Sequence, residues 1–272
     1  MLDEKKSNLI AYEITPDQYT FGSQLQGTVL QPDGQWDAYL PTEEDQQKRG
    51  LETSNCTSFA TLNCAEILFR RLYGRCENNS DRFLGIVAGT TEKGNSPQTV
   101  AEAFRRFGAI PETELPFDES IKTSADYYSP KPIPGKYIAL GDQWRRAYCL
   151  NHDWVLDGKE GVDTLKDALR YSPLGIGVFA WYCNDNGIYE RFKSYDNHWT
   201  CLVGYKEGEY WKVWDSYRPY IKKLDWNFGI KLAKRYSITD VVENLTQQVS
   251  VLQQIVNILK KLIQQKFGLW KN

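Results

Sequence analysis

The 272-residue sequence has two histidines, one methionine and almost no excess charge, and it lacks a run of eighteen apolar residues. Without such a run, a membrane span is not expected. Lys and Arg number 33 and Asp and Glu 35, so the net charge of −2 gives no electrostatic reason to expect nucleic acid as a partner. The amino terminus, Met-Leu-Asp-Glu-Lys-Lys, is too polar to lead into the apolar stretch of a secretory signal. We therefore expect a cytoplasmic protein.

The six cysteines lack the C-x-x-C spacing of zinc ligands and redox motifs. In a chain without a secretory leader they are expected to be thiols. Nothing in the sequence calls for a metal or another cofactor. Only His152 and His198 can supply a catalytic imidazole, because the chain has no other histidine.

Hydrophobic patterning divides the chain into three regions. Residues 1–35 have no sustained periodicity and are expected to form an N-terminal arm. Residues 36–239 have helix patterns followed by strand patterns, which predicts one α+β domain. In residues 240–272, apolar residues alternate steps of three and four, which is typical of an amphipathic helix with heptads. This C-terminal helix either docks on the domain or joins copies of the chain into a homo-oligomer.

A helix is predicted over residues 54–73, where apolar residues recur at helical spacing and Gly74 ends the pattern. Ser54 or Asn55 would cap this helix, which places Cys56 in its first turn. A cysteine is nucleophilic as the thiolate, and the positive end of a helix dipole favours that form. Cys56 is therefore the candidate nucleophile.

The remaining patterns predict two helices and three strands, over residues 97–107, near 162–171, and over 174–180, 199–205 and 210–214. The last two strands are separated by a polar turn with Gly, which predicts a hairpin. Residues 120–160, rich in Pro, Tyr and Trp, are expected to form a crossing segment with one strand around 137–140.

His198 and Asp215 lie at the same end of the predicted hairpin. His198 directly precedes the first strand, and Asp215 directly follows the second. Antiparallel strands bring these two positions together at the open end, where the carboxylate can accept a hydrogen bond from the imidazole ring. With Cys56 they form a candidate Cys-His-Asp triad.

Five segments resemble sequence blocks of papain-like cysteine peptidases, and they occur in the same order. They are Ser-Asn-Cys-Thr-Ser-Phe-Ala at 54–60, Ser-Pro-Leu-Gly-Ile-Gly-Val at 172–178, Gly-Ile-Tyr at 187–189, His-Trp-Thr-Cys-Leu-Val-Gly-Tyr at 198–205 and Tyr-Trp-Lys-Val-Trp-Asp-Ser-Tyr at 210–217. The resemblance spans roughly residues 36–225. It implies the family's two-lobed fold, with a helical lobe that bears the Cys and an antiparallel β lobe that bears the His and Asp.

The resemblance also implies an activity, the hydrolysis of peptide bonds in a peptide or protein substrate. In that activity Cys56 is the nucleophile, His198 the acid and base, and Asp215 the residue that orients the histidine. Substrate-binding roles are implied for Gly94, Asn95, Ser96, Asn197 and Trp199. Trp199 stands where the family usually has a small residue, which predicts a narrowed or reshaped specificity pocket.

The chain departs from the family's pattern at three positions, with Asp215 in place of Asn, Tyr217 in place of Trp and Gly50 in place of the oxyanion glutamine. Gln46 or Gln47 is expected to supply the oxyanion donor, through a loop with a few extra residues. Glu52 is a poor substitute, because a carboxylate repels an oxyanion unless it is protonated.

Two other functions fit the same residues. The chain order Cys, His, Asp also fits transglutaminase-like and amidase acyltransferases. A catalytically inactive domain of this fold is the second alternative, with the helix of residues 240–265 as the part that binds a partner.

Overall fold

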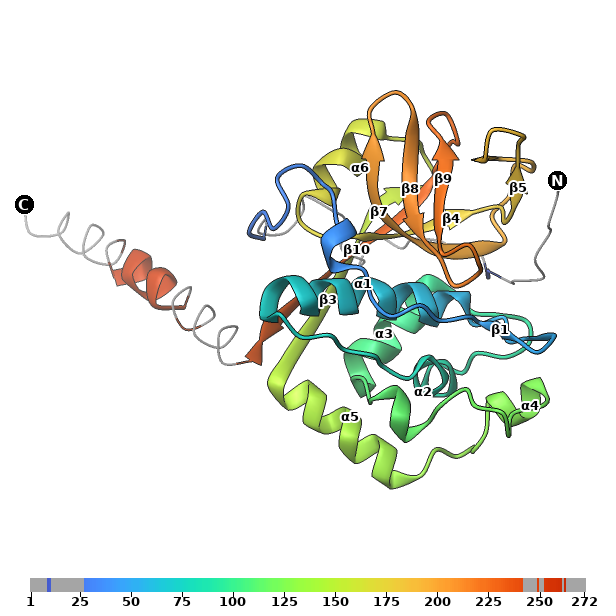
Figure 1. Ribbon diagram of the computed structural model, residues 1–272. Coiled ribbons are helices and arrows are strands. Elements are labelled where there is room, and N and C mark those ends of the chain that lie inside the picture. The colour runs from blue at the N-terminus through green and yellow to red at the C-terminus, as the bar shows by residue number, and fades with distance from the viewer. Residues whose placement is uncertain (1–8, 11–26, 242–248, 250–251, 261, 263–272) are drawn as a thin grey trace, which may run out of the picture.

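The structure is a computed structural model that describes residues 9–10, 27–241, 249, 252–260 and 262 of the chain. Its first half is mainly helical, with α1 (Cys56–Tyr73), α2 (Asp81–Val87), α3 (Pro97–Phe107), α4 (Ser124–Tyr127), α5 (Gly135–Ala147), the short 3-10 turns η1 (Asp37–Tyr39) and η2 (Glu112–Glu114), and the small hairpin β1 (Gln47–Lys48) and β2 (Leu51–Glu52). The helices lie below the sheet in Figure 1. The predicted α+β class is confirmed.

The second half forms one large sheet. Its elements are β3 (Tyr148–Asp157), α6 (Val162–Leu169), β4 (Leu174–Val178), β5 (Tyr182–Cys183), β6 (Ile188–Glu190), β7 (His198–Lys206), β8 (Tyr210–Trp214), β9 (Ile221–Asp225) and β10 (Leu232–Asp240). The strand order is β3-β10-β4-β7-β8-β9-β6-β5. Neighbouring strands are antiparallel except for β6 and β9, which pair in parallel and thus depart from the expected all-antiparallel lobe.

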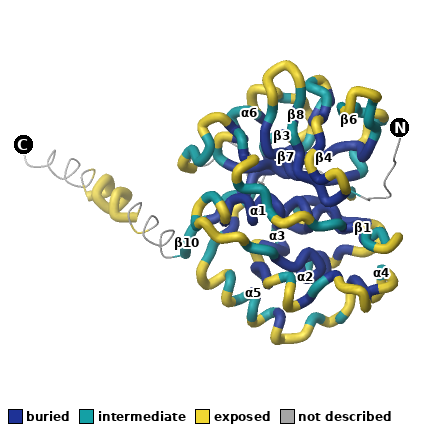
Figure 2. The backbone as a smooth tube through the Cα atoms, viewed as in Figure 1, coloured by how far each residue is buried: buried dark blue, intermediate teal, exposed yellow. Residues whose placement is uncertain are grey.

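Helix α1 is buried along most of its length. It contacts β7, β10 and β4 on one side and α2 and α3 on the other, so it lies between the sheet and the remaining helices (Figure 1). Its buried surface is mixed, because apolar residues such as Phe59 and Leu62 are buried together with polar ones such as Asn63 and Glu66. Figure 2 shows α1 and the inner strands as one continuous buried layer. This packing fixes the direction in which the first turn of α1 points.

The boundaries of α1 follow the prediction, but its cap differs. Gly74 ends the helix with a left-handed φ of 65°, as expected. Asn55 occupies the N-cap position, yet its side chain makes no capping bond. Its amide donates instead to the Asp81 carbonyl and the Tyr127 hydroxyl, at 2.8 and 2.9 Å. Asn55 therefore ties the start of α1 to the helical lobe.

The crossing segment differs from the prediction, because residues 137–140 lie in α5 rather than in a strand. Tyr137 and Gly141 are the buried residues of α5, and their spacing of four is helical. A Cβ atom on Gly141 would lie 2.1 Å from the Phe107 carbonyl oxygen, so glycine allows α5 to approach the end of α3. The pattern was missed because glycine carries no hydrophobic signal.

The predicted hairpin is confirmed as β7 and β8. Cys201 pairs with Trp214 and Lys206 with Tyr210, and the register shifts between Leu202 and Gly204. The hairpin therefore begins with His198, and Asp215 follows its second strand.

The C-terminal region is described only in part. Residues 252–260 are helical and exposed, as Figure 2 shows, and Leu252 and Leu259 are 60% and 52% exposed. Val249 and Val256 are exposed as well, whereas the heptad positions in 242–248 and at 263 lie outside the described residues, as does most of the predicted arm. The region boundaries, the homo-oligomer and the cytoplasmic location stay predictions. Within the described residues, none of the helices is long and apolar enough to cross a membrane.

Candidate active site

Cys56, His198 and Asp215 meet where α1 faces the open end of the β7–β8 hairpin. All three are buried. His198 Nε2 lies 2.6 Å from Asp215 Oδ1, and the imidazole also hydrogen-bonds the Cys56 side chain. The backbone N–H of Cys56 is at the first position of α1, where no intrahelical acceptor exists. The structure thus brings the three predicted triad residues together.

Charge in this triad favours an imidazolium. Burial alone would lower the pKa of His198, but the charge and hydrogen bond of Asp215, together with the Cys56 side chain, raise it to about 9. Burial likewise opposes the charge on Asp215, yet its pKa lies well below the usual range because Lys222 and His198 are close. An imidazolium beside a thiol is the arrangement that stabilises a thiolate.

Lys222 is a residue of the site that the sequence analysis missed. It lies in β9, its side chain is buried, and its ammonium donates to Asp215 Oδ2 at 2.8 Å. In the segment Ile-Lys-Lys-Leu-Asp the two apolar residues lie on opposite faces of a strand, so the sequence gives no sign of which lysine points inward. Only the pairing of β8 with β9, which places this strand beside Asp215, reveals it.

Aromatic rings enclose the imidazole. Tyr217 lies against the His198 ring at 5.1 Å between centroids, and Trp181 approaches its edge at 5.5 Å. Tyr217 therefore covers one face of the imidazole, at the position where the papain-like pattern has a Trp. Excluding water in this way strengthens the His198–Asp215 hydrogen bond, because the local dielectric constant is low.

Gln46, rather than Gln47, reaches the site. Gln47 is exposed and pairs with Glu52 in the β1–β2 hairpin. Gln46 is fully buried, and its amide oxygen accepts from the Ser216 hydroxyl at 2.7 Å. Since Ser216 follows Asp215 directly, Gln46 lies beside the triad. The β1–β2 hairpin supplies the extra residues that separate Gln46 from Cys56.

Both N–H groups of the Gln46 amide have partners inside the protein. Nε2 donates to Glu52 Oε1 at 2.7 Å and to the Tyr217 hydroxyl at 2.6 Å. Tyr217 in turn donates to Glu52 Oε2 at 2.7 Å. Burial and the nearby Glu52 carboxylate raise the pKa of Tyr217, so this hydroxyl remains a donor. Glu52 is therefore an acceptor that holds the amide of Gln46, the predicted oxyanion donor, and the sequence did not indicate this contact.

Two of the predicted substrate-binding residues, Asn95 and Asn197, accept backbone hydrogen bonds from the chain itself. The Asn95 carbonyl accepts from the Ile10 N–H at 3.1 Å, and the Asn197 carbonyl accepts from the Leu9 N–H at 3.2 Å. Leu9 pairs with Asn95 in parallel. A short extended stretch thus bridges the helical lobe and the β lobe next to His198.

Gly94 and Ser96 shape this edge rather than contact the stretch. Gly94 has a positive φ of 80° and its N–H donates to the Thr91 carbonyl. The Ser96 hydroxyl caps α3 by accepting from the Thr99 N–H at 3.1 Å. Both residues hold Asn95 in place.

Trp199 lies in an apolar cluster next to the nucleophile. The cluster contains Cys56, Ala60, Trp154 and Trp199, and Leu9 packs against it. The two tryptophan rings meet edge to face at 6.4 Å. An indole therefore fills space beside Cys56, and the narrowed specificity pocket stays a prediction.

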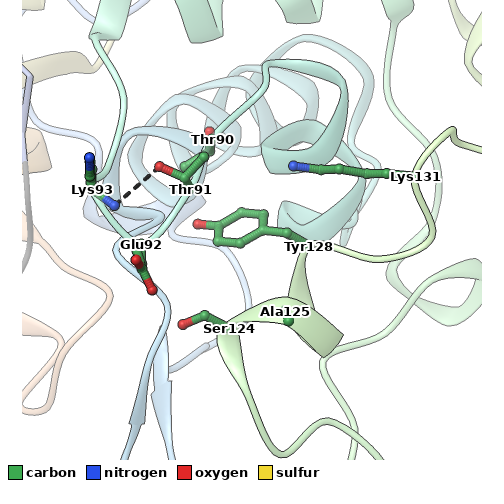
Figure 3. A pocket seen from close by; sticks show the side chains of 8 residues that line it. All are labelled: Thr90, Thr91, Glu92, Lys93, Ser124, Ala125, Tyr128 and Lys131. Carbon is green, nitrogen blue, oxygen red and sulfur yellow. Dashed lines mark hydrogen bonds between the residues drawn. The ribbon is translucent and has the colours of Figure 1, made fainter.

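A pocket of about 450 Å³ opens on the helical-lobe side (Figure 3), lined by Thr90, Thr91, Glu92, Lys93, Ser124, Ala125, Tyr128 and Lys131. The Tyr128 hydroxyl donates to the Thr53 carbonyl at 2.6 Å, three residues before Cys56. Burial and then the Cys56 and Glu52 charges raise the pKa of Tyr128. The pocket wall therefore extends to the edge of the triad.

All six cysteines are free thiols, as expected. Cys64 of α1 and Cys201 of β7 are in contact at 3.2 Å between sulfurs, deep in the core. Among the described residues, no group of three or more His, Cys, Asp or Glu side chains is placed to hold a metal ion.

A helix that begins at a buried cysteine is packed on a sheet that supplies a histidine and a carboxylate, the arrangement expected of the papain-like class. No protein-family model and no curated protein matches the sequence. Among solved structures, digestive procathepsin L 3 of the Tenebrio molitor larval midgut matches with a TM-score of 0.56 and 15% identity, over 85% of this chain and 76% of its own.

Two further structures give the same result. A ragweed cysteine protease that is a major pollen allergen, in its proform, has a TM-score of 0.54 and 16% identity, over 79% of this chain and 67% of its own. The cysteine protease and lectin-like domains of a surface layer associated protein of Clostridium difficile reach a TM-score of 0.61 and 15% identity, over 87% of this chain and 57% of their own. The chain therefore has the papain-like fold predicted from its sequence.

Proposed function

We propose that the chain is a cysteine peptidase that hydrolyses peptide bonds through an acyl-enzyme intermediate. The observation that carries this proposal is the buried Cys56–His198–Asp215 set, in which the pKa of the imidazole is raised to about 9. At neutral pH the histidine is then an imidazolium, and its proton comes from the Cys56 thiol.

Acylation begins when the Cys56 thiolate attacks the carbonyl carbon of the scissile amide. The negative charge moves to the carbonyl oxygen, where the Cys56 N–H and the helix dipole of α1 stabilise it. Gln46 adds a second donor once one N–H of its amide leaves Glu52 or Tyr217. His198 then protonates the leaving amine, the C–N bond breaks and a thioester remains.

Deacylation reverses the proton flow. His198, now neutral, removes a proton from water, and the hydroxide attacks the thioester carbon. The C–S bond breaks, the carboxylic acid product leaves, and Cys56 returns as a thiolate beside the imidazolium. Asp215 keeps the ring oriented through Nε2 in both half-reactions.

The substrate we propose is an extended peptide with an apolar side chain. The Asn95 and Asn197 carbonyls are acceptors for its backbone N–H groups, in the way that they now accept from Ile10 and Leu9. The apolar side chain would pack against Trp199 in the cluster where Leu9 lies. A tryptophan leaves limited room, so we expect medium-sized residues to be preferred over aromatic ones.

A thiol-directed epoxide probe on the full chain tests this proposal. We expect it to label Cys56 and to lose that labelling in His198→Ala, because the thiol is then no longer activated. Cys76 is exposed and serves as the control, since its reaction with the probe should not depend on His198. Unlabelled Cys56 in the folded protein would refute the proposal.

Incubating the protein with peptides and amine donors distinguishes the transferase alternative. Hydrolysed peptide supports a peptidase, and an amine joined to the acyl group without hydrolysis supports a transglutaminase-like or amidase-type transfer.

A binding module of the same fold is the second candidate. It is favoured by one observation, that both N–H groups of Gln46 are bound to Glu52 and Tyr217. A protein that labels at Cys56 but never releases product would support this candidate, because formation of the thiolate does not need the oxyanion donor.

A further inference from the structure

Lys222 is one of the most completely paired groups near the triad. Its ammonium donates to Asp215 Oδ2 at 2.8 Å, to the Pro219 carbonyl at 2.6 Å and to the Tyr217 carbonyl at 2.5 Å. An ammonium has three N–H groups, so each has an acceptor. The indole of Trp181 lies 5.1 Å from the ammonium and adds a cation–π contact.

Strand β9 places this lysine inward by regular alternation, on the same face as the buried Leu224. Ile221 is 46% exposed whereas Lys222 is 2% exposed, so the strand buries an ammonium and leaves an isoleucine in solvent. A buried ion pair is weak evidence for stability, because an apolar side chain of similar volume often serves as well. The buried ammonium therefore calls for an explanation other than packing.

The charges of the site suggest that explanation. Asp215 and Lys222 together are neutral, and so are the Cys56 thiolate and the His198 imidazolium. A lone buried carboxylate at Asp215 would hold the proton on His198 too firmly, and this proton has to reach the leaving amine. In the papain-like pattern an uncharged Asn stands at this position and orients the histidine without adding a charge. This chain has Asp215 there instead.

We infer that Lys222 is a positioning residue that neutralises Asp215, so that the Asp215–Lys222 pair orients His198 without trapping its proton. The catalytic role in this inference rests on the proposed function. The electrostatic role concerns the pKa of the His198 imidazole, which can be measured without peptide hydrolysis.

The groups that face this pair come from several elements. Cys56 of α1 hydrogen-bonds the imidazole, and Tyr217 lies against the ring and donates to Glu52 of β2. Tyr189 of β6 faces the ammonium at 5.8 Å. The Glu52 carboxylate is linked to the His198 ring through Tyr217, whose hydroxyl donates to it. The variants below leave all of these unchanged.

The test is a histidine NMR titration of the full chain, wild type against three variants: Lys222→Met, Asp215→Asn, and the double variant. Only two histidines contribute signals. His152, whose pKa burial lowers to about 3, reports on folding without titrating near neutral pH. We expect the His198 midpoint to rise by about one pH unit in Lys222→Met and to fall below the wild-type value in the double variant.

Peptide hydrolysis provides the second readout. We expect kcat/KM to fall roughly tenfold in Lys222→Met and to recover when Asp215→Asn is added, because the neutral pair is restored. A lysine that only supports the structure would give a double variant no better than the single ones. Lys223→Met, on the exposed face of the same strand, is the matched control and should change neither readout.

Two outcomes would overturn the inference: an unchanged His198 midpoint in Lys222→Met, or a double variant without recovery. If Lys222→Met does not fold, Lys222→Gln keeps a donor without the charge and takes its place with the same expectations. If the midpoint moves as expected while the wild-type protein hydrolyses no peptide, the proposed function fails and the electrostatic role of Lys222 stands.

Discussion

The two halves of the active site differ in how their charges are arranged. On the proton-transfer side, Cys56 faces His198 and Asp215 faces Lys222, so each charge has an opposite partner. On the oxyanion side, the Gln46 amide faces the Glu52 carboxylate. The first half is arranged for chemistry as it stands, whereas the second has to exchange a hydrogen bond before it can stabilise an oxyanion.

For the proposed peptidase, we expect the oxyanion half to limit the rate. Making a thiolate requires only groups that are already in contact. Stabilising the tetrahedral intermediate requires Gln46 to release an acceptor whose charge repels the oxyanion.

Removing the proposed nucleophile, in the proton-transfer half of the site, should abolish peptide hydrolysis. We expect Cys56→Ala to lower kcat by about 10⁴-fold or more, because no other group can form the thioester. Hydrolysis of a fluorogenic peptide measures this loss, and Cys76→Ala, which removes an exposed thiol, should retain full activity. Equal losses in both variants would place the nucleophile elsewhere.

Removing the oxyanion donor should cost less. We expect Gln46→Ala to lower kcat by roughly 10²- to 10³-fold with little change in KM, since the donor acts in the transition state. Its neighbour Gln47 is exposed, so Gln47→Ala is the matched control. A Gln46→Ala enzyme with wild-type kcat would mean that the Cys56 N–H acts alone.

Neutralising the Glu52 carboxylate should improve the stabilisation of the oxyanion. We expect Glu52→Gln to raise kcat roughly tenfold, corresponding to about 1.4 kcal/mol of like-charge repulsion. Glu43→Gln removes the same charge at an exposed position, so it controls for the change in the net charge of the protein. A fall in kcat would instead show that Glu52 is needed to orient Gln46, and the comparison of the two halves would have to be reversed.

Enlarging the pocket should alter selectivity more than rate. We expect Trp199→Ala to shift the preference toward larger apolar side chains by about tenfold, because each added methylene contributes about 1 kcal/mol or more of selectivity. Competition between peptides with Leu and Phe measures the ratio. Thermal unfolding should accompany the assay, since Trp199 is fully buried against Trp154. An unchanged ratio would remove Trp199 from the specificity pocket.

The pH dependence should reflect His198. Its pKa is raised to about 9, above the ordinary value of 6.5, so kcat/KM should decline as the pH rises through about 9. The same group contributes stability that is fully present below pH 6.5 and is lost as the pH rises through about 9. Asp215→Asn should move the decline to lower pH. A profile with no decline by pH 10 would place the proton on another group.

The triad could be predicted because each member has a local signal. Cys56 begins a helix, and His198 and Asp215 flank a hairpin whose register follows from alternation and a turn. The fold could be predicted for the same reason, since α1, β7 and β8 carry strong patterns.

The rest of the site depends on contacts between distant segments. Gln46 and Gln47 could not be separated, because only the β1–β2 pairing determines which one turns inward. Lys222 could not be found, because its partner Asp215 follows a neighbouring strand and because Ile221 and Leu224 leave the inward face of its own strand ambiguous. Helix α5 was missed because Gly141, which allows its close contact with α3, has no side chain to form a periodic signal.

The stretch formed by Leu9 and Ile10 has a kinetic consequence. It occupies the backbone acceptors of Asn95 and Asn197, and it belongs to the same chain. Dilution of the protein therefore does not weaken the binding of this stretch to the two carbonyls. A tethered segment of this kind competes with a free peptide at an effective concentration on the order of millimolar. The apparent affinity for any peptide is then the intrinsic one multiplied by the fraction of time in which the edge is vacant. A high KM for a peptide would then reflect occupancy of these carbonyls by Leu9 and Ile10, and not a poor fit of the peptide.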